Sequence, residues 1–268
     1  MYSGTTLRSK SGRLMGVHQK IDRIARKQLK RHLPRVNNFP TTHDILHFEG
    51  LNGPDGIKRK SPGRDEPWHY IDPKNPDDKS LMIMISDHIE NLSVALRNDN
   101  KERAAFEAAW MAHAITDGLT PAHHYPLDDK IEELWGKPKE ERLTIKDKNI
   151  IKGINRRDTL SKNWEYWGTS GVYTNHFMFE WGVGTSIVSS SFDDIGLNQP
   201  DLDRLETDNF ETIFNEALQR VAAMGMYDEF SRLGWTRHLA VETREELIPE
   251  IAKTVALGWY AAILKAKT

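Results

Sequence analysis

Residues 101–123 read KERAAFEAAWMAHAITDGLTPAH and contain the most informative pattern in the chain. Residues 101–117 predict a helix, which Gly118 and Pro121 bring to an end. Residues four apart lie on one face of a helix, so His113 and Asp117 direct a nitrogen and a carboxylate to the same place. His123 follows just past the end of this helix, where the chain turns back. The stretch is therefore a candidate for one part of a metal site at the end of a helix.

A second pair, His176 and Glu180 in HFMFE, has the same four-residue spacing. Two such pairs on separate helices are one way in which helical bundles build a metal site. Neither pair has the HExxH spacing of zinc proteases. Each pair also has an ordinary interpretation, since Asp117 can cap or pair with a neighbour and His176 can be a core histidine. The two pairs together favour metal binding.

The remaining candidate ligands lie nearer the N-terminus. Residues 35–78 are rich in glycine and proline and predict a long irregular loop. Such a loop inside a compact domain is often functional, and this one carries Asp55 after a proline and His69 in HYIDP. His18 lies in the first turn of a helix predicted over residues 17–33, where a lone histidine is more often a surface or capping residue.

Helical patterns predominate elsewhere in the chain. We expect helices over residues 79–97, 172–191, 201–226 and 242–265, and partly helical structure over 127–165. No stretch has a strand pattern of any length. These patterns predict an all-α fold with one helical domain over residues 17–268, preceded by a flexible N-terminal segment over residues 1–16.

The composition narrows the chemistry. Hydrophobic residues make up 38% of the 268 residues and charged residues 28%, which is typical of a soluble globular protein. There is no cysteine, so any metal must be held by the eleven histidines together with aspartate and glutamate, ligands that suit zinc. A net charge of -2 exerts no general attraction for nucleic acid or an anionic membrane.

The sequence also bears on location. No stretch approaches the roughly 20 apolar residues that a membrane span needs. Residues 1–16 are polar and basic and lack the apolar core of a secretory signal. We therefore expect a cytoplasmic protein without a transmembrane segment.

The motifs resemble those of the zinc-dependent phospholipase C family, whose fold is shared with the zinc-dependent single-strand nucleases. The resemblance covers about residues 14–185 and includes an HxxxD helix followed by a histidine, an HxxxE helix, a Pro-Asp pair, and a His-aromatic-x-Asp-Pro run. The matching positions are His18, Pro54, Asp55, His69, Tyr70, Asp72, Pro73, His113, Asp117, Pro121, His123, His176 and Glu180.

The resemblance implies a single-domain, multi-helix zinc hydrolase that binds two zinc ions, or three. One zinc would be held by His69, His113 and Asp117. A second would be held by three further residues, which are His123, His176 and Glu180. Asp117 would connect the first zinc to a third, which His18 helps to bind.

The resemblance also implies that Asp55 lies beside the attacking water, as a base or an orienting group. Clustered metal ions suit the hydrolysis of an anionic phosphodiester. A further carboxylate such as Asp72 would fix the orientation of the ligand histidines.

The chain departs from the family in two places. The family binds its third zinc through the amino and carbonyl groups of an N-terminal tryptophan, whereas this chain has no tryptophan before Trp68. We expect other groups such as His47 or Glu49, or water, to complete that site, or the site to be absent. The family also has a short connection where this chain has residues 124–175, which we interpret as a helical excursion that serves as a substrate lid or as surface decoration.

We expect a phosphodiester substrate, and the upstream loop resembles the phospholipase branch of the family more closely, which implies a phospholipid rather than single-stranded nucleic acid. The aromatic residues Trp164, Tyr166, Trp167 and Tyr173 suit a peripheral membrane contact. The basic run 58–60 suits the phosphates of a nuclease substrate. A third hypothesis is a non-catalytic, metal-stabilised binding protein. The missing tryptophan favours this hypothesis and the presence of Asp55 disfavours it.

Overall fold

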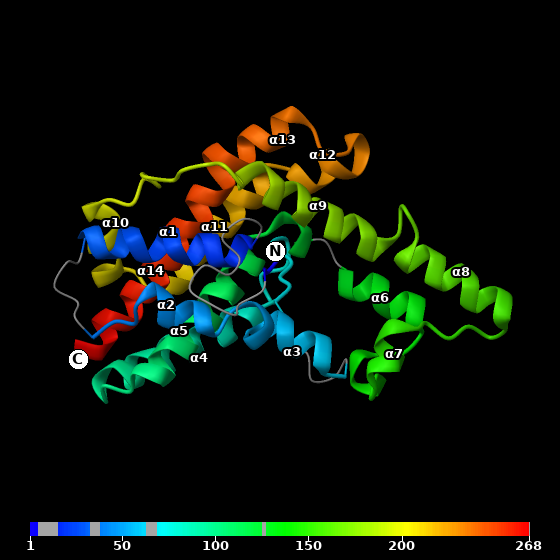
Figure 1. The fold of residues 1–268 in the computed structure, drawn as a ribbon, viewed down its shortest axis with the longest axis horizontal. Helices are drawn as coiled ribbons and strands as arrows, with labels where there is room; N and C mark the ends of the chain where they lie inside the picture. Colours follow the sequence, from blue (N-terminus) through cyan, green and yellow to red (C-terminus); the bar gives the residue numbers. More distant parts are fainter. Residues whose placement is uncertain (5–15, 33–37, 63–68, 125–126, 268) are drawn as a thin grey trace.

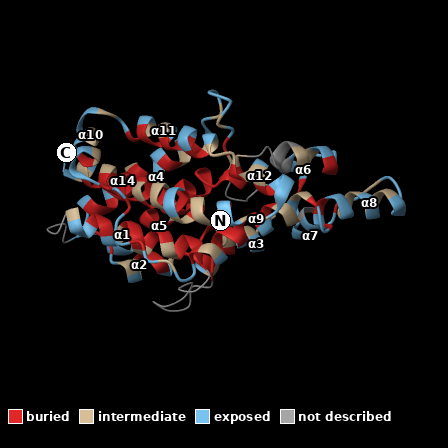
Figure 2. Ribbon diagram, turned by 90° about the horizontal axis from the view of Figure 1, so that it is seen from above, coloured by how far each residue is buried: buried red, intermediate tan, exposed pale blue. Residues whose placement is uncertain are grey.

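The computed structural model describes residues 1–4, 16–32, 38–62, 69–124 and 127–267. Every regular element in these ranges is helical, which confirms the all-α class (Figure 1). Four long helices form the centre of the bundle: α1 (Val17–His32), α4 (Ser80–Arg97), α5 (Lys101–Gly118) and α14 (Ile248–Lys267). Their buried faces make one continuous core (Figure 2).

Helix α5 lies close to its neighbours because its inward face carries small side chains. Ala104, Ala108 and Ala112 follow one another at four-residue spacing, and none is more than 1% exposed. The buried indole of Trp259 on α14 donates a hydrogen bond of 2.9 Å to the carbonyl oxygen of Ala108. This packing fixes α5, and with it the histidine and aspartate at its C-terminal end.

The predicted helices over 79–97 and 101–117 are confirmed as α4 and α5. The helix predicted over 172–191 is α9 (Val172–Ile187) and ends earlier. The single helix predicted over 201–226 was wrong, because two helices occupy this region: α10 (Gln199–Thr207) and α11 (Phe210–Ala223). A further helix, α12 (Met226–Leu233), begins at its last residue. The side chain of Asn209 accepts from the Thr212 N–H at 2.8 Å and so begins a new helix.

The last helix begins earlier than predicted. It runs through α13 (Arg237–Glu242), a π-helical turn η5 (Thr243–Leu247) and α14 without interruption. Residues 237–267 are long and apolar enough to cross a membrane by length and composition alone. However, 72% of their most apolar window is buried inside the bundle, as in the core helix of a globular domain.

The irregular loop predicted over residues 35–78 contains short helices where the structure describes it. These are α2 (Thr42–His47), the 3-10 turn η1 (Gly50–Asn52) and α3 (Pro54–Lys60). Pro54, one of the prolines that suggested a loop, takes the first turn of α3. Helix α2 is begun by a capping box of Thr41 and Asp44.

Residues 127–167 project from the side of the bundle, and we call them the arm (Figure 1). The arm contains α6 (Leu127–Trp135), η4 (Lys139–Glu141), α7 (Ile145–Asn149) and α8 (Arg156–Trp167). It has a small core of its own, made by Leu134, Trp135, Ile151 and Tyr166. The helical character predicted for the 124–175 insert is confirmed, and its function as a lid stays a prediction.

Candidate metal centre

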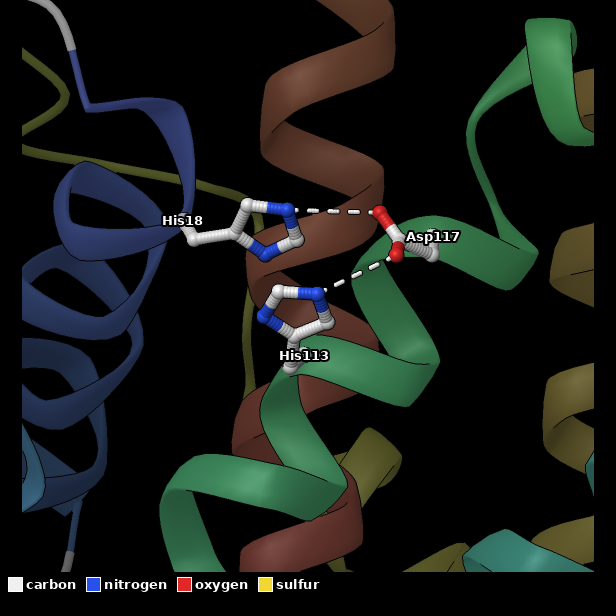
Figure 3. A group of neighbouring side chains, drawn as sticks. All are labelled: His18, His113 and Asp117. Carbon is white, nitrogen blue, oxygen red and sulfur yellow. Dashed lines mark ion pairs between the residues drawn. The ribbon is translucent and has the colours of Figure 1, made fainter. Parts of the chain in front are cut away.

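The C-terminal end of α5 and the first turn of α1 bring His18, His113 and Asp117 together (Figure 3). His18 Nε2 lies 3.2 Å from Asp117 Oδ1, and His113 Nε2 lies 3.2 Å from Asp117 Oδ2. The two imidazole rings stack with centroids 3.8 Å apart. All three side chains are buried, so three potential ligands converge in a site shielded from water.

The two oxygens of Asp117 face different sets of nitrogens. Oδ2 faces His113 and also His69, whose Nδ1 is 3.1 Å away. Oδ1 faces His18 instead. The structure therefore assembles the predicted trio of His69, His113 and Asp117, and it places Asp117 where one carboxylate can serve two ions.

A second trio comes from the turn after α5 and from α9. His123 lies in the 3-10 turn η3 (Pro121–His123), and His176 and Glu180 lie one turn apart on α9. The Nε2 atoms of His123 and His176 are 3.1 and 2.9 Å from Glu180 Oε1. His123 Nε2 is also 3.8 Å from Asp117 Oδ1, so the two trios form one continuous polar cluster.

The rings of two candidate ligands are oriented through their second nitrogens. His113 Nδ1 lies 3.3 Å from both carboxylate oxygens of the buried Glu49. His123 Nδ1 lies 3.1 Å from the carbonyl oxygen of His69. These contacts leave each Nε2 directed into the cluster, as is usual for metal-binding histidines.

The expectation that Asp72 fixes a ligand histidine was wrong. Asp72 is exposed, and its carboxylate accepts from the Lys74 N–H at 2.9 Å within a turn. Glu49, instead of Asp72, contacts a ligand histidine, because its carboxylate lies 3.3 Å from His113 Nδ1. Glu49 immediately precedes the 3-10 turn η1. No local sequence pattern marks it as the partner of His113, which is 64 positions away.

Main-chain atoms of Met1 lie beside Asp117 and His18, at the predicted third metal position. The Met1 amino group contacts Asp117 Oδ1 and lies 3.2 Å from Glu180 Oε1. The Met1 carbonyl oxygen is 2.7 Å from His18 Nε2. The site therefore has an amino and a carbonyl group beside Asp117 without any tryptophan.

Neither of the substitutes expected from the sequence lies there. The side chain of His47 is exposed and contacts Phe48. Glu49 is occupied with the other nitrogen of His113.

Residues 1–4 are fixed against α1 and α9. The Val17 N–H donates to the Tyr2 carbonyl oxygen at 2.9 Å, and Gly4 exchanges two hydrogen bonds with the Gln19 side chain. The Tyr2 ring makes edge contacts with Phe177 and Trp181. Of the segment predicted to be flexible, these four residues are anchored, and residues 5–15 lie outside the described residues.

Asp55 lies at the edge of the cluster. Its Oδ1 is 3.8 Å from His113 Nε2, and its side chain is 32% exposed, whereas the Glu49 side chain is fully buried. The position depends on Gly56, because a Cβ there would lie 2.1 Å from the Leu51 carbonyl oxygen. Glycine at residue 56 thus allows α3 to pack on η1 with Asp55 facing the histidines.

The electrostatics of the cluster keep its carboxylates ionised. Burial alone would raise the pKa of Asp117, but the Met1 ammonium and the histidines hold it well below its usual value. Burial acts on Glu180 in the same direction, and the Met1 ammonium and His176 again hold its pKa low. Burial lowers the pKa values of His69 and His123 to about 4. Metal binding requires ionised carboxylates and neutral imidazoles, and these four groups are in that state at neutral pH.

The same carboxylates favour positive charge at the centre of the cluster. Burial lowers the pKa of the Met1 amino group, but Asp117 and Glu180 more than offset this and raise it to about 10. Burial also lowers the pKa of His113, which Glu49 and Asp117 raise well above its usual value. His113 Nε2 is nevertheless buried without a hydrogen-bond partner. A buried imidazole nitrogen that lies 3.2 Å from Asp117 Oδ2, among carboxylates that favour a cation, fits a metal site. Nitrogen and oxygen ligands of this kind suit zinc.

Comparisons with known proteins identify no relative: no family model, no curated protein and no solved structure matches this chain.

The position of Met1 leads to a testable expectation. Adding Gly-Ser before Met1 converts its buried amino group into an amide, which has no lone pair for a metal and no charge for Asp117 and Glu180. We expect the extended chain to bind about one metal ion fewer per molecule, because the ligands on the Asp117 Oδ1 side are incomplete. Elemental analysis measures this, with Gly-Ser added after Thr268 as the matched control. Equal metal content in the two extended chains would contradict a ligand function for Met1.

Proposed function

We propose that this chain is a zinc-dependent phosphodiesterase of the phospholipase C type, which hydrolyses a phospholipid at its phosphate ester. The observation that carries the proposal is the arrangement around Asp117. Its two oxygens face separate sets of nitrogens, and the second trio is 3.8 Å away through His123. A purely structural zinc site is usually a closed set of four ligands, whereas this cluster offers three protein ligands around each of several adjacent positions.

The distances between the side chains indicate which residues would share each metal position. His69, His113 and Asp117 Oδ2 would hold one ion. The trio of His123, His176 and Glu180 would hold a second. The third position, beside Asp117 Oδ1, would be completed by His18 and Met1. Adjacent zinc ions bound there would neutralise the charge of a phosphodiester, lower the pKa of water and stabilise the leaving alkoxide.

Asp55 supplies the proton chemistry. It is the partly exposed carboxylate beside His113, so both a water molecule and a substrate can reach it. A carboxylate in this position orients the attacking water or accepts its proton. Asp55 follows Pro54 at the start of α3, and its place at the edge of the cluster fits a reacting group better than a structural one.

A phospholipid is favoured by the surroundings of the cluster. Tyr173, Phe177 and Trp181 are partly exposed at four-residue spacing along α9, the helix that carries His176 and Glu180. Aromatic rings of this kind suit the region between lipid headgroups and acyl chains. They also suit stacking with unpaired bases, and Arg59 is exposed four residues after Asp55. This makes single-strand nuclease activity the second candidate.

The proposal is tested by assaying zinc-loaded protein on a soluble short-chain phosphatidylcholine and, in parallel, on a single-stranded DNA oligonucleotide. We expect release of phosphocholine, loss of the activity on chelation and recovery when zinc is returned. Cleavage of DNA with the lipid left intact would support the nuclease instead. Turnover of neither substrate at full zinc occupancy would favour a metal-stabilised binding protein.

A further inference from the structure

The arm exposes more large apolar side chains than its own folding requires. Ile154 is 96% exposed, Leu160 is 72% exposed and Trp164 is 69% exposed. Leu143, Ile145 and Ile150 are also exposed, and we call these six residues the arm surface. Apolar residues gathered on one projecting unit, rather than scattered singly, are typical of a binding surface.

The arm is already folded without these residues. Its small core buries Trp135 against Tyr166, with ring centroids 5.3 Å apart. The Trp135 indole donates to the Asp147 carbonyl oxygen at 2.6 Å. The side chain of Asn163 pairs with both the N–H and the carbonyl oxygen of Ile151, at 3.2 and 2.7 Å. The arm surface therefore lies outside a finished core and is free to contact something else.

Charge on the arm is divided between its two halves. Residues 127–142 contain six acidic and four basic residues, whereas residues 143–167, which include the whole arm surface, contain six basic and three acidic ones. Lys146, Lys152, Arg156 and Arg157 are exposed in the basic half. Basic residues interspersed with exposed aliphatic ones match an anionic lipid surface, where each basic side chain adds to the attraction.

The apolar residues are placed for shallow insertion. Leu160 and Trp164 are one turn apart on α8 and share a face of that helix. Helix α8 begins at the end of the arm farthest from the bundle (Figure 1), and Ile154 lies two residues before this beginning. Figure 2 shows that most of α8 is exposed. Tryptophan at the interface and aliphatic side chains at a projecting tip are the usual means of peripheral membrane binding.

The arm is connected to the metal centre by aromatic contacts. Tyr70 packs against the arm core and stacks on His123, with ring centroids 4.7 Å apart. A second contact joins Trp167 at the end of α8 to Tyr173 on α9, with ring centroids 4.7 Å apart. These contacts join the base of the arm to the helix that carries His176 and Glu180.

We infer that the arm surface, with the basic residues around it, docks this protein on an anionic lipid bilayer. The aliphatic residues favour a bilayer over a nucleic acid, because isoleucine and leucine provide no platform for stacking bases. In the further step that the same bilayer supplies the substrate, the inference rests on the proposed function. Docking itself requires no turnover and is measured separately.

The test is flotation of the full chain with vesicles of phosphatidylcholine alone or with about one third phosphatidylserine. We expect binding to the anionic vesicles that weakens in 0.5 M salt. The triple variant Ile154→Ser, Leu160→Ser, Trp164→Ser should reduce the bound fraction at least tenfold, and Arg156→Glu with Arg157→Glu should do so on anionic vesicles only. The matched control is Ile83→Ser with Leu233→Ser, two residues each 60% exposed outside the arm, which should bind as wild type does.

Each variant is also assayed on the soluble phosphatidylcholine and by thermal melting. Unchanged melting together with lost vesicle binding supports docking through the arm. Vesicle binding by the triple variant at the wild-type level overturns the inference. The inference is also overturned if wild type binds no vesicles but binds a single-stranded oligonucleotide, and the arm variants lose that binding. Absence of turnover in every variant, with vesicle binding still dependent on the arm, would overturn the proposed function while leaving the docking inference in place.

Discussion

Replacing Asp117 with Asn is expected to empty much of the metal centre and abolish hydrolysis. The amide keeps the size of the side chain but loses the negative charge of the carboxylate, whose two oxygens contact His18, His69 and His113. Substituting residues that only support a metal ligand costs about 10–100-fold in metal affinity or activity. A carboxylate shared by two ions should exceed this, so we expect at least about a 100-fold loss of affinity.

The measurement is elemental analysis of Asp117→Asn beside wild type after dialysis, together with turnover of the soluble phosphatidylcholine. Asp87→Asn, the same substitution on an exposed aspartate of α4, is the matched control and should behave as wild type. Metal retained at the wild-type level with full activity would show that Asp117 binds no ion.

Replacing Asp55 with Asn is expected to slow hydrolysis by about 10²–10⁴-fold while leaving the metal content unchanged, since this is the usual contribution of a positioned acid or base. Asp55 Oδ1 is 3.8 Å from His113 Nε2, and the side chain is partly exposed at the edge of the cluster. The amide can still orient water by hydrogen bonding but cannot accept a proton. A fall in kcat at constant zinc occupancy therefore separates Asp55 from the metal ligands.

The controls for Asp55 are the metal content and melting temperature of the variant, which should match wild type. Unchanged kcat would remove Asp55 from the reaction. Loss of zinc from the variant would instead make Asp55 a ligand, and its function as a base would be wrong.

The residues of the candidate centre were predictable where their geometry is local. The HxxxD and HxxxE pairs lie on helices, and a spacing of four places two side chains on one face whatever the tertiary structure. The structure accordingly finds His113 with Asp117 and His176 with Glu180. The family resemblance added His18, which lies in the same cluster.

Main-chain ligands were not predictable in this way. The contact of Met1 with Asp117 joins residues 116 positions apart and uses amino and carbonyl groups that every residue possesses. No side-chain pattern marks such a contact. The hydrogen bond between Gly4 and the Gln19 side chain, which helps to hold residues 1–4 on α1, could not be predicted from the sequence pattern either.

The fold was predictable at the level of long helices but not of their interruptions. Helices α4 and α5 have apolar faces long enough to define them. By contrast, the division between α10 and α11 depends on the Asn209 cap, whose side-chain oxygen accepts from Thr212, and α2 depends on the Thr41–Asp44 capping box. Single caps contribute about 1 kcal/mol each, which is enough to divide a helix and too little to dominate a pattern of apolar residues.

The most direct test of the central claim is the metal content of the purified wild-type chain, equilibrated with zinc and measured by elemental analysis against protein concentration. The geometry around Asp117 predicts two or three zinc ions per chain, because its two oxygens face separate sets of nitrogens and the second trio adjoins them. Zero or one ion per chain in zinc-replete buffer would contradict a clustered centre, and with it the proposed hydrolysis.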